Sequence, residues 1–239
     1  MKTTYNRLKS AIFFEYLPMT ITGIGILACA IAFKQSFIKI LPLFFSLFIM
    51  LFNSRAKRIG FLLGSLNSLL YMVIYFIEGI FGSALSTLFG IIMMMTAFFC
   101  WKEDGKGNDT TFRRLSNKWR AIFGSLFVVA WTVSIIILSK AGGKAVIFDA
   151  FVFVSGFVVP VLNIRAYIES PFLNALGCFS TCLLWGQIII LENNLSNLTF
   201  FIYGIYSLYM VVRTFFKWLS TYKLQMAELE SQMVNDAKN

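Results

Sequence analysis

Eight polar and aromatic side chains lie within long apolar stretches of this sequence, and their types suit the binding of a small flat molecule that carries hydroxyl groups. They are Asn67, Thr87, Asp149, Asn174, Trp185, Gln187, Tyr203 and Tyr206. A polar group in apolar surroundings costs free energy unless it is satisfied, so such positions often mark a functional site. We therefore expect these residues to bind a substrate.

The amide, hydroxyl and carboxyl groups of this set could hydrogen-bond a sugar or an amide. Asn67, Thr87 and Asn174 have this chemistry, and the alternative is that they join neighbouring helices at about 0.6–2 kcal/mol per contact. Asp149 lies about one turn into its apolar stretch. Its carboxyl group could hold a ligand hydroxyl, pair with a neighbouring helix or take a proton.

The aromatic members could enclose a flat ring between their faces. Tyr203 and Tyr206 are three residues apart and share one face of a helix, and Trp185 lies deep in its own apolar stretch. Gln187, two residues further on, would then bind the edge of the ring. The alternative is ordinary aromatic packing or an interfacial aromatic belt.

Enzymatic and metal chemistry find no support in the residue types. The chain has no His, and its four cysteines, Cys29, Cys100, Cys178 and Cys182, all fall inside apolar stretches. No nucleophile is accompanied by a base, and a metal site of the usual ligands is improbable without His. We expect no catalytic residue, no metal and no cofactor, and the protein is predicted not to be an enzyme.

Composition indicates a polytopic membrane protein. Hydrophobic residues make up 58% of the chain and charged residues only 13%, against about 45–50% and about 25% in soluble proteins. The net charge of +10 does not indicate nucleic-acid binding, because the Lys and Arg residues lie in the short gaps between apolar stretches and not on one polar face.

Eight stretches have the length of about 20 residues that a helix needs to cross a bilayer. They are residues 14–33, 37–53, 59–78, 81–101, 119–139, 145–163, 169–191 and 195–218. Lys34, Lys39, Lys140 and Lys144 fall on one side of this arrangement, and the rest of the 21 Lys and Arg residues fall on the other. The positive-inside rule then places both termini in the cytoplasm.

A repeated sequence divides the chain into two similar parts. Asn53-Ser-Arg-Ala and Asn163-Ile-Arg-Ala are 110 residues apart, and each lies between the first and second apolar stretch of a group of three that ends in Trp, at Trp101 and at Trp218. A single stretch between the groups gives them the same orientation, so they are predicted to be parallel repeats that enclose a site near the middle of the bilayer. This architecture is typical of transporters.

The repeat sets the expected domains. We predict an N-terminal segment with an extra transmembrane helix (1–36), a first three-helix repeat (37–101), a cytoplasmic loop and linker helix (102–144), a second three-helix repeat (145–218) and a cytoplasmic tail (219–239). The fold class is therefore an all-α polytopic membrane protein with a 3+1+3, SWEET-like core. In the tail, Tyr222, Met226, Leu229 and Met233 have the spacing of an amphipathic helix.

This layout resembles the PnuC family of bacterial vitamin transporters. The resemblance covers about residues 40–218 and includes a Gly-x-x-Asn pattern at Gly64 and Asn67, an Asp at Asp149 and an Arg-x-x-x-Glu turn at Arg165 and Glu169. It implies a homotrimer in the bacterial inner membrane. It also implies facilitated diffusion of nicotinamide riboside, which cytoplasmic phosphorylation then traps.

Two features of the family pattern are absent from this chain. The family's Trp-x-x-Trp pair falls on Pro171 and Asn174, and the Gln expected in the third helix falls on Thr87. Because the missing pair stacks on the vitamin ring in the family, thiamine, riboflavin, deoxynucleosides or a sugar remain alternative substrates. No proton relay crosses the spans, since Glu15, Glu78 and Glu192 lie at their ends, and this favours facilitated diffusion.

Overall fold

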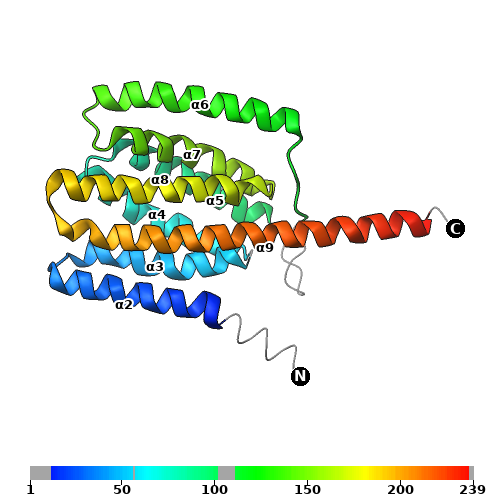
Figure 1. The fold of residues 1–239 in the computed structure, drawn as a ribbon, viewed down its shortest axis with the longest axis horizontal. Helices are drawn as coiled ribbons and strands as arrows, with labels where there is room; N and C mark the ends of the chain where they lie inside the picture. The colour runs from blue at the N-terminus through cyan, green and yellow to red at the C-terminus, as the bar shows by residue number, and fades with distance from the viewer. Residues whose placement is uncertain (1–11, 56, 102–110, 237–239) are drawn as a thin grey trace.

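The computed structural model describes residues 12–55, 57–101 and 111–236, and these residues form helices joined by short turns (Figure 1). The order is η1 (Ile12–Tyr16), α2 (Leu17–Ala32), α3 (Phe37–Ser54), α4 (Ile59–Ile77), α5 (Phe81–Cys100), α6 (Asn117–Lys140), α7 (Val146–Ile164), α8 (Glu169–Glu192), η2 (Leu195–Asn197) and α9 (Leu198–Asp236). Some residues used above to predict the orientation and the repeat lie outside the described residues: Lys2, Arg7, Lys9, Ala56, Lys102, Lys106 and Lys238.

The predicted all-α polytopic fold is confirmed. Seven of the described helices, α3 to α9, are long and apolar enough to cross a membrane. The first predicted span is also helical, but α2 has only 16 residues and is shorter than the other seven. That α2 crosses the bilayer therefore stays a prediction.

The turns between helices follow from local backbone chemistry. Gly79 and Gly142 end α4 and α6 with φ values of +72° and +73°, a conformation that glycine adopts without a steric penalty. At the start of α6, the Ser116 hydroxyl accepts a hydrogen bond from the backbone N–H of Trp119, which is the usual chemistry of an N-cap. Short turns of this kind force successive helices to alternate in direction.

Six helices form a closed ring. Each of α3, α4, α5, α7, α8 and α9 packs on the next in that order, and α9 packs on α3 to close the circle. The first helices of the two predicted repeats, α3 and α7, run in the same direction (Figure 1). The ring therefore brings the third helix of each repeat against the first helix of the other.

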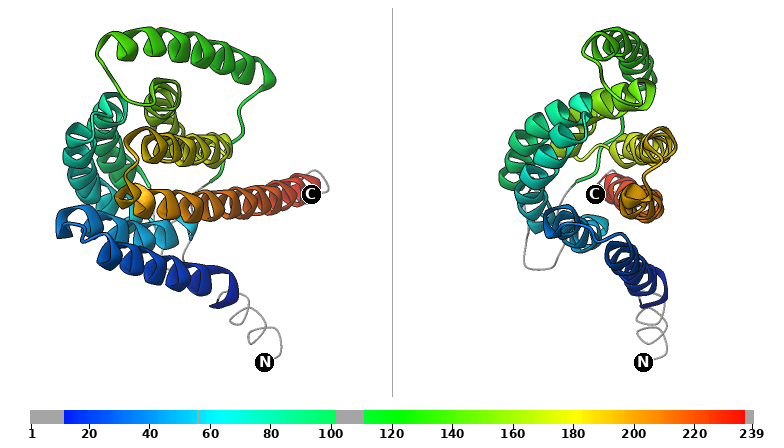
Figure 2. Two further views of the ribbon diagram at one scale, coloured as in Figure 1. Left: turned by 60° about the vertical axis from the view of Figure 1, so that its left-hand side comes forward. Right: turned by 90° about the vertical axis from the view of Figure 1, so that its left-hand side faces the viewer.

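Two helices lie outside the ring, at opposite edges of the molecule (Figure 2). Helix α2 packs on α3 and α9, and α6 packs chiefly on α7. The 39-residue α9 continues without a break past Trp218 and projects beyond the bundle (Figure 1).

Buried apolar residues form two clusters along the axis of the ring. The basic-end cluster lies where Arg58, Arg113 and Arg165 are found, and the far-end cluster lies towards Lys39 and Lys144. The basic-end cluster contains Phe61, Ala97, Trp101, Phe112, Ala166, Ile168 and Trp218. The far-end cluster contains Ile26, Leu43, Leu47, Ile74, Ile80, Ala145, Leu184, Trp185, Ile188, Phe200, Tyr206 and Met210.

Large apolar side chains also cover the outside of the bundle. Phe99 is 75% exposed and Ile190 is 80% exposed, which would be costly in water but suits contact with lipid. Apolar residues thus occupy both the inside and the outside of the ring, so polar side chains inside it stand out.

Candidate functional site

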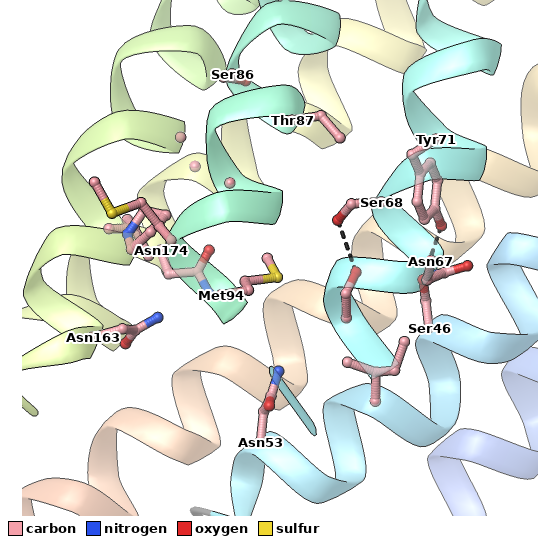
Figure 3. Close-up of a pocket in the computed structure, with 18 of the residues that line it drawn as sticks. Ser46, Asn53, Asn67, Ser68, Tyr71, Ser86, Thr87, Met94, Asn163 and Asn174 are labelled. Atoms are coloured by element: carbon pink, nitrogen blue, oxygen red, sulfur yellow. Dashed lines mark hydrogen bonds between the residues drawn. The ribbon is translucent and has the colours of Figure 1, made fainter. Parts of the chain in front are cut away.

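A cavity of about 300 Å³ lies inside the ring, between the two apolar clusters (Figure 3). All six ring helices contribute to its wall. Tyr71 and Tyr203 line it and pack against the far-end cluster, whereas Phe61 and Ala97 line it from the basic-end cluster. We call this cavity the central pocket.

Asn67 is a buried, hydrogen-bonded polar residue in the wall of the central pocket. Its amide nitrogen donates hydrogen bonds to the carbonyl oxygen of Pro42 (3.0 Å) and to Ser46 Oγ (2.8 Å), and Ser46 Oγ donates in turn to Tyr71 Oη (3.1 Å). The Asn67 side chain is 6% exposed, and its Oδ1 has no hydrogen-bond partner among the described residues. A buried acceptor without a partner is costly, so Oδ1 is a polar atom that the described residues leave unsatisfied at the edge of the cavity.

Aromatic rings form one side of the central pocket. Tyr71 of α4 and Tyr203 of α9 have ring centroids 6.4 Å apart with an interplanar angle of 30°, and Tyr71 also stacks on Tyr75 at 5.7 Å. These rings come from opposite halves of the chain. Tyr71 and Tyr203 thus place aromatic rings from both repeats in the wall of the cavity.

Thr87 and Asn174 also line the central pocket. The Thr87 hydroxyl donates to the carbonyl oxygen of Ser83 (2.7 Å), so it can offer a ligand only its oxygen lone pairs. Asn174 comes from α8, across the pocket from Asn67 (Figure 3). Of the eight predicted site residues, the pocket thus brings together Asn67, Thr87, Asn174 and Tyr203.

The asparagines of the repeated turns, Asn53 and Asn163, face the same cavity. Ser170 Oγ donates to Asn163 Oδ1 (2.6 Å), but the equivalent position in the first half is Gly60. Asn53 Oδ1 consequently has no partner among the described residues. The equivalent asparagines of the two halves therefore differ: Asn163 Oδ1 is hydrogen-bonded and Asn53 Oδ1 is not.

Asp149 lies outside the central pocket and caps a helix. Its carboxylate accepts hydrogen bonds from the backbone N–H groups of Gly82 (3.0 Å) and Ser83 (2.8 Å), and from Ser83 Oγ (2.6 Å). The side chain is fully buried. A carboxylate at a helix N-terminus satisfies unpaired donors and interacts favourably with the helix dipole, so Asp149 joins α7 to the start of α5.

The other three predicted site residues also lie outside the central pocket. Trp185 stacks on Phe200, with centroids 4.3 Å apart and an interplanar angle of 13°. Tyr206 donates to the carbonyl oxygen of Leu47 (3.4 Å), and Gln187 does not line the cavity. Contact of these residues with a substrate stays a prediction.

Most of the sequence matches a known family. A sequence profile described as nicotinamide mononucleotide transporter matches residues 36–220. The chain belongs to the nicotinamide mononucleotide transporter family. The match confirms the resemblance to PnuC, begins just before α3 and leaves α2 outside.

A solved structure supports the same fold for this family member. It is described as the crystal structure of the vitamin B3 transporter PnuC, and it superposes with a TM-score of 0.74 over 88% of this chain and 92% of the other, at 18% identity. At this identity the likeness shows the fold alone. No curated protein matches the chain.

Family membership points to a transporter and not to an enzyme. Ser46, Tyr71, Asn53 and Asn163 line the central pocket but were not predicted as site residues. The repetition of Asn53 and Asn163 was a usable signal, but it indicated equivalent turns and not a cavity. Ser46 and Tyr71 gave no signal, because single residues of these types are common in apolar helices.

Proposed function

We propose that this transporter carries a nicotinamide-containing nucleoside, nicotinamide riboside in particular, by facilitated diffusion through the central pocket. The observation that carries the proposal is the unpaired Asn67 Oδ1 in a neutral, partly aromatic cavity inside the ring. A carboxamide or a ribose hydroxyl supplies the donor that this acceptor requires. Tyr71 and Tyr203 offer faces to a pyridinium ring, whose positive charge aromatic rings attract.

The charge of the pocket favours a nucleoside over a nucleotide. None of the described residues that line the cavity is charged. A phosphate group would enter it without a counter-ion, which is costly in a medium of low polarity. The same property supports trapping, because a riboside phosphorylated in the cytoplasm could not return through a neutral pocket.

The basic end of the bundle is proposed to face the cytoplasm of a bacterium, with the protein in the inner membrane and both termini inside. The support is the unequal distribution of Lys and Arg, which favours this orientation. We also propose a homotrimer, on the resemblance to the family alone. Chemical cross-linking of the full chain in membranes tests the trimer.

Uptake into proteoliposomes tests the substrate. Radiolabelled nicotinamide riboside is offered with a tenfold excess of unlabelled riboside, nicotinamide mononucleotide, thiamine, riboflavin, thymidine or glucose. We expect competition by the riboside and none by the mononucleotide. If uptake of the labelled riboside does not exceed that of protein-free liposomes, or if excess unlabelled riboside does not reduce it, the riboside proposal is wrong.

A further inference from the structure

A second cavity, of about 680 Å³, lies outside the ring between α6 and the facing surfaces of α7, α8 and α9. We call it the lateral groove. Its walls are largely apolar and include Phe123, Phe127, Phe172, Leu176 and Phe215. It does not share a lining residue with the central pocket, so the transport site does not explain it.

The groove lies beside α6, which packs on α7 from its middle towards the far end and is held to α8 near the basic end. Of its described residues only Ser134 and Leu138 are buried, both in the half towards the far end. There Trp131 Nε1 also donates to the carbonyl oxygen of Ile147 (3.0 Å). Near the basic end, Arg120 Nε donates to Glu169 Oε1 (3.0 Å) and holds α6 to α8.

The end of the groove at the basic side carries positive charge. Arg114 and Arg120 line it together with Glu169. The Glu169 carboxylate is occupied, because it binds Arg120 and accepts from the backbone N–H of Leu115. Arg114 is exposed, as are Arg113 and Lys118 close by in the sequence. Positive charge therefore exceeds negative charge at this mouth.

We propose that the lateral groove binds one anionic phospholipid from the leaflet at the basic end. An acyl chain lies along the apolar walls beneath Gly124, and the phosphate lies beside Arg114 and Arg120. An arginine guanidinium can donate hydrogen bonds to two phosphate oxygens at once. Basic pockets between transmembrane helices are known sites for anionic headgroups.

A second copy of the chain fits the groove less well than a lipid. In a cyclic oligomer whose axis is normal to the bilayer, all copies have the same orientation in the bilayer, so a neighbour would bring its own basic end to this mouth. With a net charge of +10 per chain, that contact would oppose like charges. An anionic lipid supplies the missing counter-charge.

Gly124 gives the sharpest test, because a side chain added there would enter open space. A Cβ atom at Gly124 meets no other atom within 4 Å, so Gly124→Leu is expected to fold and to fill the groove. Ser125→Leu is its matched control, since Ser125 is exposed on the same helix and does not line the groove. For charge, Arg114→Gln is compared with Lys140→Gln at the exposed far end of α6.

The measurement is native mass spectrometry of the detergent-purified full chain, titrated with phosphatidylglycerol or with phosphatidylcholine. We expect one phosphatidylglycerol per chain in the wild type and in both controls. Binding should be about five-fold weaker in Arg114→Gln, since a basic residue near a lipid headgroup is worth about 1 kcal/mol. Gly124→Leu should no longer bind phosphatidylglycerol. Leu176→Trp, which fills the groove from α8, replaces Gly124→Leu if that variant does not fold.

Several outcomes would overturn the proposal. Equal retention of the two lipids, or retention of phosphatidylglycerol by both groove-filling variants, would show that no anionic lipid occupies this groove. Disulfide formation between two chains that carry Gly124→Cys, in membranes under oxidising conditions, would show that a second copy covers it.

Discussion

At the scale of single residues, Asn67 connects the sequence pattern to the pocket most directly. Its amide nitrogen is committed to Pro42 and Ser46, and this fixes the direction of Oδ1. Because Pro42 and Ser46 are both on α3, the bonds also join α3 to α4. Of the two roles predicted from sequence, the nitrogen makes the helix contact, and substrate binding through the unpaired oxygen stays a prediction.

A leucine substitution at Asn67, compared with one at a polar residue outside the pocket, tests whether Asn67 itself contributes to substrate binding. Asn67→Leu removes the acceptor, and we expect KM for riboside uptake to rise about two- to ten-fold, since a neutral hydrogen bond is worth about 0.5–1.5 kcal/mol. Thr96→Leu is the control, because Thr96 is exposed and lies outside the central pocket. Initial uptake rates, normalised to folded protein by size-exclusion chromatography, provide the measurement. Equal KM values for the two variants would contradict the assignment.

Tyr203 supplies the second prediction at this scale. Tyr203→Phe keeps the ring that faces Tyr71 and should leave KM nearly unchanged, whereas Tyr203→Leu should raise it about two- to ten-fold, because an aromatic contact is worth about 0.5–1.5 kcal/mol. Tyr209→Leu serves as the control, since Tyr209 is on the outside of the same helix and its hydroxyl bonds Phe14. A matching loss in the control would mean that α9 tolerates no change and that stacking is not responsible.

Four of the eight site residues predicted from sequence line the central pocket, for a physical reason. Asn67, Thr87, Asn174 and Tyr203 are polar or amphipathic residues in the interior of spans, where such groups are uncommon. Trp185 satisfied the same criterion, but its neighbours on α4 and α9 enclose it in an aromatic stack. The periodicity of a sequence predicts which residues share a face of a helix. It does not predict which other helix packs on that face, so residues of the pocket and of the core cannot be distinguished from one sequence.

At the scale of helices, the ring is held together by contacts at the helix ends. Asp149 joins α7 to α5. Gln35, just before α3, bonds the hydroxyl of Thr199 at the start of α9 through its Oε1 (3.1 Å). These two contacts lie at equivalent junctions between the repeats. They close the ring at the far end, on the side of the pocket away from the basic end.

Asp149→Asn tests whether this carboxylate is a cap or part of the transport site. We expect the free energy of unfolding to fall by about 1.5–3 kcal/mol, the value of a charged hydrogen bond, while the uptake rate per folded molecule stays the same. Thermal unfolding in detergent and uptake measure the two quantities. Glu192→Gln is the control, since that carboxylate forms a partly exposed pair with Lys144 of about 0–1 kcal/mol. A drop in uptake without a drop in stability would instead favour substrate or proton binding.

The hydropathy pattern predicted the ends of most transmembrane helices but not the end of α9. The apolar lengths of α3, α4, α5, α7 and α8 were predicted to within about two residues, because polar turns interrupt them. Helix α9 continues for a further 18 residues to Asp236, since the chain after Trp218 contains good helix formers and no Gly or Pro. The change from apolar to polar side chains there does not mark the end of the helix.

At the scale of the whole molecule, the central pocket lies between two apolar layers contributed by both repeats. Trp101 and Trp218, which end the two groups of three helices, pack 5.7 Å apart in the basic-end cluster. Trp185 and Phe200 stack in the far-end cluster. A ring of two similar halves can open one layer while the other stays closed, which gives alternating access to one site.

Exchange kinetics test this scheme for the complete transporter. Proteoliposomes preloaded with unlabelled riboside should take up labelled riboside faster than empty ones. In preloaded liposomes the protein carries riboside in both directions and does not have to return with an empty pocket. A proton ionophore should change neither rate, since the described residues lining the pocket include no titratable carboxylate or His. The measurement is labelled uptake over time at equal protein content, with protein-free liposomes as the control. Accumulation above equilibrium that the ionophore abolishes would replace facilitated diffusion by proton coupling and would direct attention to Asp149, the fully buried carboxylate between α5 and α7 of the ring.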